Sequence, residues 1–427
     1  MRSLARLALA AAAALSLVGC SDSNSPVEPL RATPNSLFLP GPRGPKASPE
    51  DFVAITAGWD FTCARKMNGN LYCWGRDDHG QTGGFTSKKC STTILCVNKP
   101  AQVFKSSGGA LLVTQIDAGA THACALEANN TAWCWGDGNQ GQVGFMNGLY
   151  GDFSPNPVTG GLSFSSISAG WTSTCGVTTA PAIFCWGKVA NQASAPTLFD
   201  NDPAFRFSQV TVGDVHVCAI DILTMYGTPR CKGNNLNGQG GQASSAQIAF
   251  SQATTFGNQV GSITTDGYFT CVDQVAGTML TVQCVGLNDY GELGNGQTGT
   301  GTSTGTAQTV GNGTLSLHNV TTGSVHACAL DTTNRAFCWG NGFWGQLGNG
   351  NSTGYTIDPN AQHVFSTPQL VSGGHTYRAL AAGHQHTCGI GTDNVIYCWG
   401  SDQAGQLGQG NPTGGLATQP IPLQPIP

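Results

Sequence analysis

A pair of cysteines recurs seven times along the chain, and the residues around each pair recur with it. The two cysteines are ten residues apart in five copies and thirteen apart in two. The pairs are Cys63 with Cys73, Cys124 with Cys134, Cys175 with Cys185, Cys218 with Cys231, Cys271 with Cys284, Cys328 with Cys338, and Cys388 with Cys398. A Gly lies two residues after every second cysteine, and a Gly-Gln/Glu-X-Gly element opens seven residues after it in six copies. A repeat of roughly 45 to 60 residues is typical of a propeller or a solenoid, because each unit must bury its apolar face against the next.

The sixth copy shows the unit most completely, as Val325-His326-Ala327-Cys328-Ala329-Leu330, then Phe337-Cys338-Trp339-Gly340, then Gly345-Gln346-Leu347-Gly348. This unit resembles the repeat of the regulator of chromosome condensation family, in a bacterial secreted form with two cysteines per repeat. The resemblance covers about residues 52 to 423 and implies an all-β fold, a seven-bladed β-propeller over residues 51 to 427. It implies little about activity, because propellers carry unrelated functions on one scaffold.

The cysteine pairs are expected to be disulfides. Each pair flanks a short turn, so a hairpin would place Cys328 opposite Cys338, where Cα atoms about 4.5 to 5.5 Å apart are within reach of a disulfide. Cys90 and Cys96 form an eighth pair, and each bridge would contribute at most roughly 2.5 to 3 kcal/mol. The alternatives are reduced, buried thiols or zinc, but one pair supplies only two zinc ligands and no Cys-X-X-Cys occurs. Such cysteine density indicates an oxidising compartment.

Residues 1 to 19 have the pattern of a bacterial lipoprotein signal peptide. Arg2 and Arg6 give a positive start, and the apolar run that follows is too short to span a bilayer. The run ends in Leu17-Val18-Gly19-Cys20, which resembles a lipobox and implies that Cys20 is lipid-modified. Ser21 in the next position then favours the outer membrane over the inner one. The alternative is an ordinary secretory leader with an incidental cysteine.

Residues 20 to 50 are expected to form a tether between the lipidated cysteine and the propeller. Seven prolines lie among Ser, Asn and Gly in residues 21 to 50. Such a composition cannot bury a core and favours an extended chain. We therefore expect an exported protein that is attached to the cell envelope by its lipid alone.

The C-terminal strand is expected to close the ring. Copies two to seven have an additional, often Pro-led segment ahead of them, and copy one has none. The missing segment appears at the other end, as Gln419-Pro420-Ile421-Pro422-Leu423. We predict that this strand completes blade one, which would remove the exposed edges of an open ring.

Variable loops indicate a binding face. The interval from the second cysteine of one copy to the first of the next is 51, 41, 33, 40, 44 and 50 residues in turn, and the variation follows the Gly-Gln-X-Gly element. Insertions at one topological point emerge on one face of a propeller, often the binding face. Aromatic residues in these loops are the candidate partner contacts, since Trp and Tyr dominate interface energetics; they are Phe85, Phe145, Tyr150, Phe343, Trp344 and Tyr355.

The repeated polar and aromatic residues do not indicate chemistry. Four histidines lie two residues before a first cysteine, but Phe61, Ser173 and Phe269 take that position in the other copies, so the site is one of packing. The repeated Trp residues favour packing between blades over stacking on sugars. Asp77-Asp78 hints at a cation, but no loop has the spaced carboxylates of a calcium site. No nucleophile, phosphate-loop or zinc-protease motif occurs. We predict no catalytic residue, no metal and no cofactor.

The composition excludes a nucleic-acid partner. The net charge is −5, and removal of Arg2 and Arg6 with the leader makes it −7. No basic surface is therefore expected. The sequence predicts a monomeric, non-enzymatic module that binds a protein or a glycan in or outside the envelope. Two alternatives stay open: an enzyme such as a lyase or glycosidase at the central channel, and guanine-nucleotide exchange, which the resemblance implies but export disfavours.

Overall fold

The computed structural model describes residues 50–84, 88–91, 93–145, 152–223, 227–250, 255–257, 259–276, 279–351, 363–410 and 415–423, with residues 48 and 86. The expected signal peptide, Cys20 and most of the tether lie outside these residues. Within them, no helix has the length and apolar character needed to cross a bilayer.

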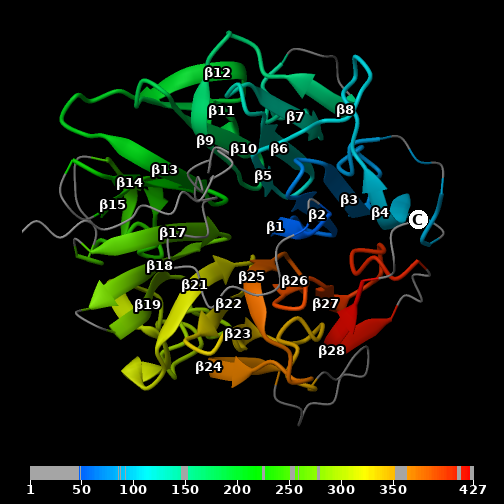
Figure 1. Cartoon of the computed structure of the whole chain (residues 1–427). Coiled ribbons are helices and arrows are strands. Elements are labelled where there is room, and N and C mark those ends of the chain that lie inside the picture. Colours follow the sequence, from blue (N-terminus) through cyan, green and yellow to red (C-terminus); the bar gives the residue numbers. More distant parts are fainter. Residues whose placement is uncertain are drawn as a thin grey trace, which may run out of the picture. The chain divides into compact units, whose positions relative to one another are not determined.

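The described chain forms the predicted all-β, seven-bladed propeller, with seven four-stranded antiparallel sheets (Figure 1). Each sheet, or blade, consists of four consecutive strands, and the first of them lies nearest the centre. The strands of blades 1 to 3 are β1 (Phe52–Ala57), β2 (Phe61–Lys66), β3 (Leu71–Arg76), β4 (Cys96–Gln102), β5 (Gln115–Ala118), β6 (His122–Leu126), β7 (Ala132–Gly136), β8 (Asp152–Pro157), β9 (Phe164–Ala169), β10 (Ser173–Thr178), β11 (Ile183–Gly187) and β12 (Ala193–Asp200).

Blades 4 to 7 follow in the same order. Their strands are β13 (Phe207–Val212), β14 (His216–Asp221), β15 (Thr228–Asn235), β16 (Ser245–Ile248), β17 (Val260–Asp266), β18 (Phe269–Ala276), β19 (Met279–Gly286), β20 (Thr304–Thr309), β21 (Leu317–Thr322), β22 (His326–Asp331), β23 (Ala336–Asn341), β24 (Val364–Leu370), β25 (Tyr377–Ala382), β26 (His386–Gly391), β27 (Ile396–Ser401) and β28 (Leu416–Pro422). Two short 3₁₀ helices, η1 (Lys188–Ala190) and η2 (Val310–Gly313), lie beside blades 3 and 5.

The C-terminal strand completes the last sheet and not the first, so that prediction was wrong. Strand β28 pairs with β27, with Ile421 opposite Cys398. Blade 1 is completed by its own β4, which pairs with β3. The Pro-led segment that was assigned to the start of each following blade is the outermost strand of the preceding one. Because every blade is made of consecutive strands, no shared sheet closes the ring (Figure 1).

All eight predicted cysteine pairs are disulfides in the structure. Seven of them join directly opposed residues on the hairpin of the second and third strands of a blade, with Cα–Cα distances of 4.0 to 4.2 Å, slightly shorter than expected. These seven are Cys63 to Cys73, Cys124 to Cys134, Cys175 to Cys185, Cys218 to Cys231, Cys271 to Cys284, Cys328 to Cys338, and Cys388 to Cys398. The eighth, Cys90 to Cys96, has a Cα–Cα distance of 5.7 Å. Each hairpin bridge therefore fastens two strands that pair within one sheet.

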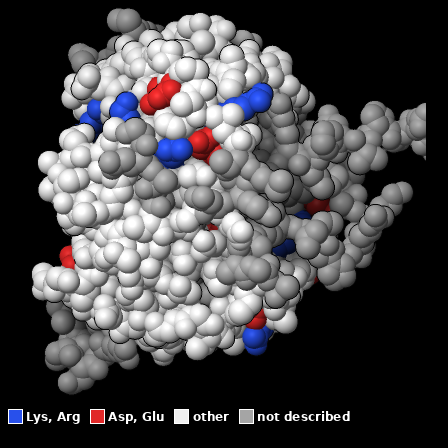
Figure 2. Space-filling model, turned by 90° about the vertical axis from the view of Figure 1, so that its left-hand side faces the viewer, with Lys and Arg blue, Asp and Glu red and all other residues white. Residues whose placement is uncertain are grey.

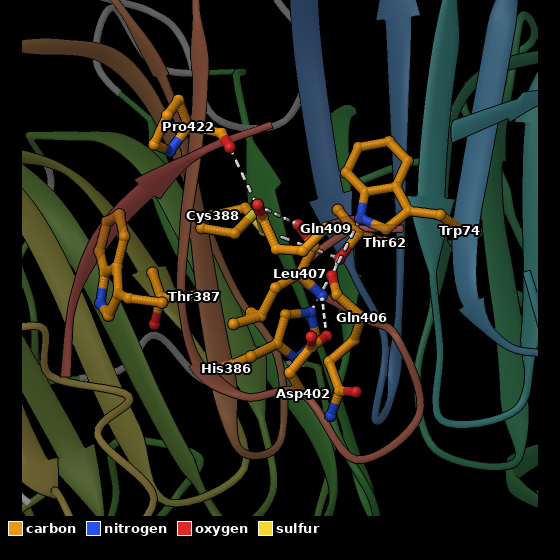
Figure 3. Close-up of a disulfide and its surroundings, with 12 residues drawn as sticks. Thr62, Trp74, His386, Thr387, Cys388, Asp402, Gln406, Leu407, Gln409 and Pro422 are labelled. Atoms are coloured by element: carbon orange, nitrogen blue, oxygen red, sulfur yellow. Dashed lines mark hydrogen bonds between the residues drawn. A yellow bond between two sulfur atoms is a disulfide. The ribbon is translucent and has the colours of Figure 1, made fainter. Parts of the chain in front are cut away.

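Neighbouring blades are joined by a buried hydrogen-bonded group that recurs around the ring. Figure 3 shows the joint between blades 7 and 1. The His386 imidazole Nε2 of blade 7 lies 2.8 Å from the Thr62 hydroxyl of blade 1, and that hydroxyl donates to the Gln406 carbonyl at 3.1 Å. The Trp74 indole N–H donates to the same carbonyl at 2.9 Å. The turn that carries Gln406 thus belongs to one blade and caps the next.

Three other boundaries have the histidine, and at each the Thr hydroxyl donates to a Gln carbonyl at 2.7 to 2.9 Å. The Trp donor completes the joint at one of the three, where the Trp399 N–H donates to the Gln346 carbonyl at 2.8 Å. The His–Thr pairs are His122–Thr174, His216–Thr270 and His326–Thr387, each at 2.8 Å. Burial lowers the pKa of His122 and His216 to about 4 and of His326 and His386 to about 3, so all four are neutral at pH 7. These histidines and the capped Trp side chains are parts of the core, as the sequence indicated.

Candidate interaction face

The loops that vary in length emerge at one end of the blades. In each antiparallel blade, the turn from the first to the second strand and the connection from the third to the fourth lie at the same end. We call this end of the propeller the upper face, and the opposite end, which carries the turns from the second to the third strand, the lower face. All connections that contain a Gly-Gln/Glu-X-Gly turn therefore share the upper face.

The predicted contact residues have different outcomes on this face. Phe85, Tyr150 and Tyr355 lie outside the described residues. Phe343 and Trp344 are partly exposed, with their rings edge-to-face at 5.0 Å and Phe343 also against His363 at 5.2 Å. They stay candidates for partner contact.

The prediction that Phe145 contacts a partner was wrong, because its side chain is only 8% exposed. It packs with Val143, Phe164 and Trp186 in the core between blades 2 and 3. The preceding Gly144 has φ 75°, and a Cβ there would lie 2.9 Å from the Trp186 indole nitrogen. The chain therefore passes directly over Trp186 and directs the next side chain into the core.

The centre of the upper face is a ring of seven turns, which we call the rim: residues 58–60, 119–121, 170–172, 213–215, 266–268, 323–325 and 383–385. Backbone hydrogen bonds connect successive turns. The Trp59 N–H donates to the Ala120 carbonyl, the Ala120 N–H to Gly170, both at 3.3 Å, and the Asp214 N–H to Gly267 at 3.2 Å. Side chains at equivalent positions of different blades are thereby held close together around the axis.

Three aromatic side chains meet on the rim from three different blades. The rings of Trp59 and Trp171 lie 5.2 Å apart at 37°, and Trp59 stacks on His384 at 5.1 Å and 26°. All three are partly exposed. Burial lowers the pKa of His384, although the charge of Asp60 opposes the shift, so its ring is neutral at pH 7. The rim thus presents a continuous aromatic surface.

Two carboxyl groups lie on the opposite arc of the rim. Burial raises the pKa of Asp266 to about 8, and the charges of Asp214 and then Asp117 add to the shift. Burial raises the pKa of Asp214 to about 7, and Lys188 opposes this. Both carboxyls are therefore partly protonated at neutral pH.

Asp214 and Asp266 accept few hydrogen bonds, whereas the neighbouring Asp117 accepts several. Asp117, on the inner strand of blade 2, accepts from the Thr56 hydroxyl and from the Ala118 and Ala169 N–H groups. Asp266 accepts from the N–H of its neighbour Gly267 at 2.7 Å. Within the described ranges, no donor reaches the Asp214 carboxyl. Asp117 is fixed by the fold, whereas Asp214 and Asp266 keep free acceptor capacity.

The rim residues were not among the predicted contacts, although the repeat contains a signal for them. Four residues before each first cysteine the seven copies have Trp59, Ala120, Trp171, Asp214, Gly267, Ser324 and His384. Six residue types occupy this position in the seven copies, directly after a position that is Gly in six of them. Such variation beside a nearly constant residue indicates that the position is free of the packing requirement. Asp266 also replaces the Gly that precedes this position in the six other copies.

The described residues offer no metal site, and the side of the molecule in Figure 2 has no basic patch. In the ranges that the structure describes, no three His, Cys, Asp or Glu side chains are placed to hold a metal ion. Figure 2 shows one side of the molecule, which is mostly uncharged, with the few cations close to acidic groups. Pairs such as Lys105–Glu127 at 2.6 Å and Arg335–Asp331 at 2.7 Å account for several of the cations. Nucleic acid is a poor fit to such a surface.

Comparisons with known proteins agree with the repeat structure. Family profiles of the regulator of chromosome condensation (RCC1) repeat match residues 52–81, 113–142 and 377–406, and a second such profile matches residues 68–126 and 334–390. The ultraviolet-B receptor UVR8 of Arabidopsis thaliana is 24% identical over 380 residues, 85% of this chain and 80% of that protein. The regulator of chromosome condensation of Mus musculus is 24% identical over 84% of this chain and 75% of its own length.

Solved structures share the fold. Prp20p from Saccharomyces cerevisiae superposes with a TM-score of 0.70 at 15% identity and covers 88% of each chain. Human WBSCR16 superposes with a TM-score of 0.66 at 17% identity and covers 83% of this chain and 94% of its own. At such identities the likeness concerns the architecture alone.

Proposed function

Because the chain belongs to the regulator of chromosome condensation repeat family, we propose that it uses its propeller as a non-enzymatic module that binds a partner through the upper face. The partner is a protein, with a glycan as the alternative. The observation that carries the proposal is the coincidence of the variable loops with the partly exposed aromatic residues of the rim on one face. Contiguous aromatic surface of this kind is a mark of interaction sites.

The fold neighbours support a role in protein binding. The structure of Prp20p is described with its binding to Gsp1p and histones, and yeast RCC1 also occurs bound to Kap60. We propose the same class of function here, with a different partner. Guanine-nucleotide exchange is disfavoured, because eight disulfides favour an oxidising compartment over the reducing one in which a small GTPase acts.

We further propose that the protein is an exported lipoprotein, attached through Cys20 to the outer membrane, and that it is a monomer. The arrangement of the cysteines supports this, because sixteen of seventeen are paired and Cys20 is the remaining one. Metabolic labelling with a palmitate analogue tests the anchor. The wild type should carry the label and sediment with membranes, and Cys20→Ser should do neither. Unchanged sedimentation of the serine variant would contradict lipid attachment.

The binding face is tested by capture of partners from the cell envelope. The bait is the full chain with Cys20→Ser, and the test variant adds Phe343→Ala and Trp344→Ala. The control adds Met67→Ser instead, on the lower face, where Met67 is 47% exposed. Proteins that bind the upper face should be lost from the first variant and retained by the second. Equal capture by both, or loss in the control alone, would refute the assignment of the face.

An enzyme at the central channel is a second candidate, favoured by the raised pKa values of Asp214 and Asp266. A carboxyl with a pKa near the working pH can serve as a general acid. A panel of chromogenic glycosides and uronides tests this candidate. If the wild type turns over a substrate and Asp266→Asn abolishes this turnover, a lyase or glycosidase activity is supported. If the wild type turns over none of the substrates, binding is the remaining candidate function.

A further inference from the structure

We propose that the rim is a binding site for a single cationic side chain, arginine or lysine, of a protein partner. The site consists of Trp59, Trp171 and His384 on one arc and Asp214 and Asp266 on the other. This inference rests on the proposed function, since it names the chemistry that the centre of the upper face recognises.

The aromatic arc supplies the first half of the site. Trp59 lies between Trp171 at 5.2 Å and His384 at 5.1 Å, and all three rings are partly exposed. Indole faces are the strongest cation–π acceptors among side chains. A guanidinium group can also stack flat against such a ring, which an ammonium ion cannot do.

On the lower face, two cationic side chains of this chain already bind an aromatic ring and a carboxylate together. Lys105 lies over the Trp133 ring at 4.7 Å while it pairs with Glu127, and Arg230 lies over Phe205 at 3.9 Å while it pairs with Asp221. In this protein an aromatic ring beside a carboxylate repeatedly holds a cation. On the rim, the rings and the carboxyls are present, and no cation lies over Trp59 or Trp171 in the described part of the chain.

The carboxyl arc supplies the second half. The backbone of Gly170–Trp171 packs against Gly213–Asp214, since a Cβ at Gly170 would lie 2.8 Å from the Gly213 carbonyl oxygen. The Asp214 turn is in turn bonded to Gly267, which directly follows Asp266. Asp214 is therefore next to Trp171 around the rim, with Asp266 one blade further on. Lys188 is the one cation that acts on Asp214, and it is exposed.

The acid-base state of the site favours a cation over a sugar. Asp214 and Asp266 are partly buried and repel each other, and they hold protons at neutral pH. A bound cation would stabilise their charged forms and so favour loss of these protons. Besides Lys188, the charged group that acts on this pair is Asp117, and Asp60 acts on His384. Binding of a cation should therefore release protons at pH 7 and strengthen as the pH rises from 6 to 8. Stacking of a neutral sugar should do neither.

The test uses the full chain with Cys20→Ser and three short blocked peptides. These are Gly-Ser-Arg-Ser-Gly and the two peptides in which Lys or citrulline replaces the Arg. Triacetylchitotriose is the glycan probe. Binding is followed by ring-proton NMR shifts and Trp fluorescence, and by calorimetry in two buffers of different ionisation enthalpy. The Arg peptide should bind at least tenfold more tightly than the citrulline peptide, several-fold more tightly at pH 8 than at pH 6, and with net proton release.

Two variants place residues that other blades already have at the same rim position. Trp171→Ala copies Ala120 of blade 2, and Asp214→Ser copies Ser324 of blade 6, so both should fold. Each should weaken the Arg peptide at least tenfold, and Ser324→Ala is the matched control that should not. Equal binding of the citrulline peptide, binding of chitotriose alone, or unchanged affinity in both variants would overturn the inference.

Failure here is distinguishable from failure of the proposed function. If capture of envelope proteins depends on Phe343 and Trp344 but not on Trp171 and Asp214, the upper face is the binding face and the rim is not its cation site. If capture and peptide binding both depend on Trp171, the partner inserts a basic side chain at the centre of the ring.

Discussion

Replacement of Thr62 by Ala should weaken the joint between the last blade and the first. The hydroxyl of Thr62 is shared by the His386 imidazole at 2.8 Å and the Gln406 carbonyl at 3.1 Å, and all three are buried. The Gln406 carbonyl keeps the Trp74 indole N–H as a donor. The variant therefore leaves one buried polar atom, the His386 Nε2, without a partner.

The magnitude follows from that one atom. A buried polar group that loses its partner costs about 1 to 3 kcal/mol. Unfolding entropy of about 2.1 cal/mol/K per residue gives about 0.8 kcal/mol/K for about 375 folded residues. A loss of about 2 kcal/mol should then lower the Tm by about 2.5 °C. Thr387→Ala at the joint between blades 6 and 7 is the matched control, because Thr387 bonds His326 and the Gln346 carbonyl, and that carbonyl also keeps the Trp399 indole N–H as a donor.

The double variant His386→Phe/Thr62→Ala gives the decisive comparison. It reproduces the pairs that other boundaries use, Phe61 with Ala123 and Phe269 with Ala327. Removal of both polar partners leaves none stranded, so the double variant should be more stable than the sum of the two single effects by about 1 to 3 kcal/mol. Differential scanning calorimetry, all in the Cys20→Ser chain, measures the parent, Thr62→Ala, His386→Phe, the double variant and the matched control. Two outcomes would refute the closure of the ring by this joint. One is additive losses in the double variant, and the other is a Thr62→Ala variant that is as stable as the wild type while Thr387→Ala is destabilised.

Three further predictions concern single positions. Cys328→Ala/Cys338→Ala should lower the free energy of unfolding by at most about 2.7 kcal/mol, because the bridge closes only a ten-residue loop; urea unfolding measures this, and an unfolded variant would contradict it. His122→Phe should reduce the dependence of stability on pH below pH 6.5. The folded-state pKa of His122 is lowered to about 4, so as the pH falls the unfolded chain takes up the proton first, which destabilises the fold by up to about 1.4 kcal/mol per pH unit. Urea titrations between pH 4.5 and 6.5 measure this slope, and an unchanged slope in the variant would contradict the prediction. Phe145→Ala should destabilise by about 3 to 5 kcal/mol while the folded fraction keeps its partners, since Phe145 is core; lost capture at full stability would return it to the surface.

Local features of the sequence were enough to predict the hairpins. Cys63 and Cys73 lie opposite each other because the turn between them is short, and that relation needs no knowledge of the rest of the chain. The packing role of the histidines followed from Phe61 and Phe269 at the same position, and the joints confirm it. The assignment of β28 failed for the opposite reason. A Pro-led strand between two motifs can pair with either neighbour, and its own residues do not indicate which.

The rim could not be recognised as a site from any one copy. Any two of Trp59, Trp171 and His384 are more than 100 residues apart in the sequence, so no local motif contains two of them. They meet because seven equivalent turns are arranged around one axis. Asp266 was visible as a departure from Gly, but its effect on Asp214 depends on burial that only the assembled ring provides.

The closure of the ring, in contrast, was encoded in pairs of positions in successive copies. Where a copy has His two residues before its first cysteine, the next copy has Thr one residue before its own: His122 with Thr174, His216 with Thr270, and His326 with Thr387. Where a copy has Phe or Ser, the next has an apolar residue: Phe61 with Ala123, Ser173 with Val217, and Phe269 with Ala327. His386 of the last copy requires a Thr, and the copy that supplies it is the first, at Thr62. A linear stack would leave one buried imidazole without a partner at its end, so this pattern of partners is satisfied only by a closed wheel of seven.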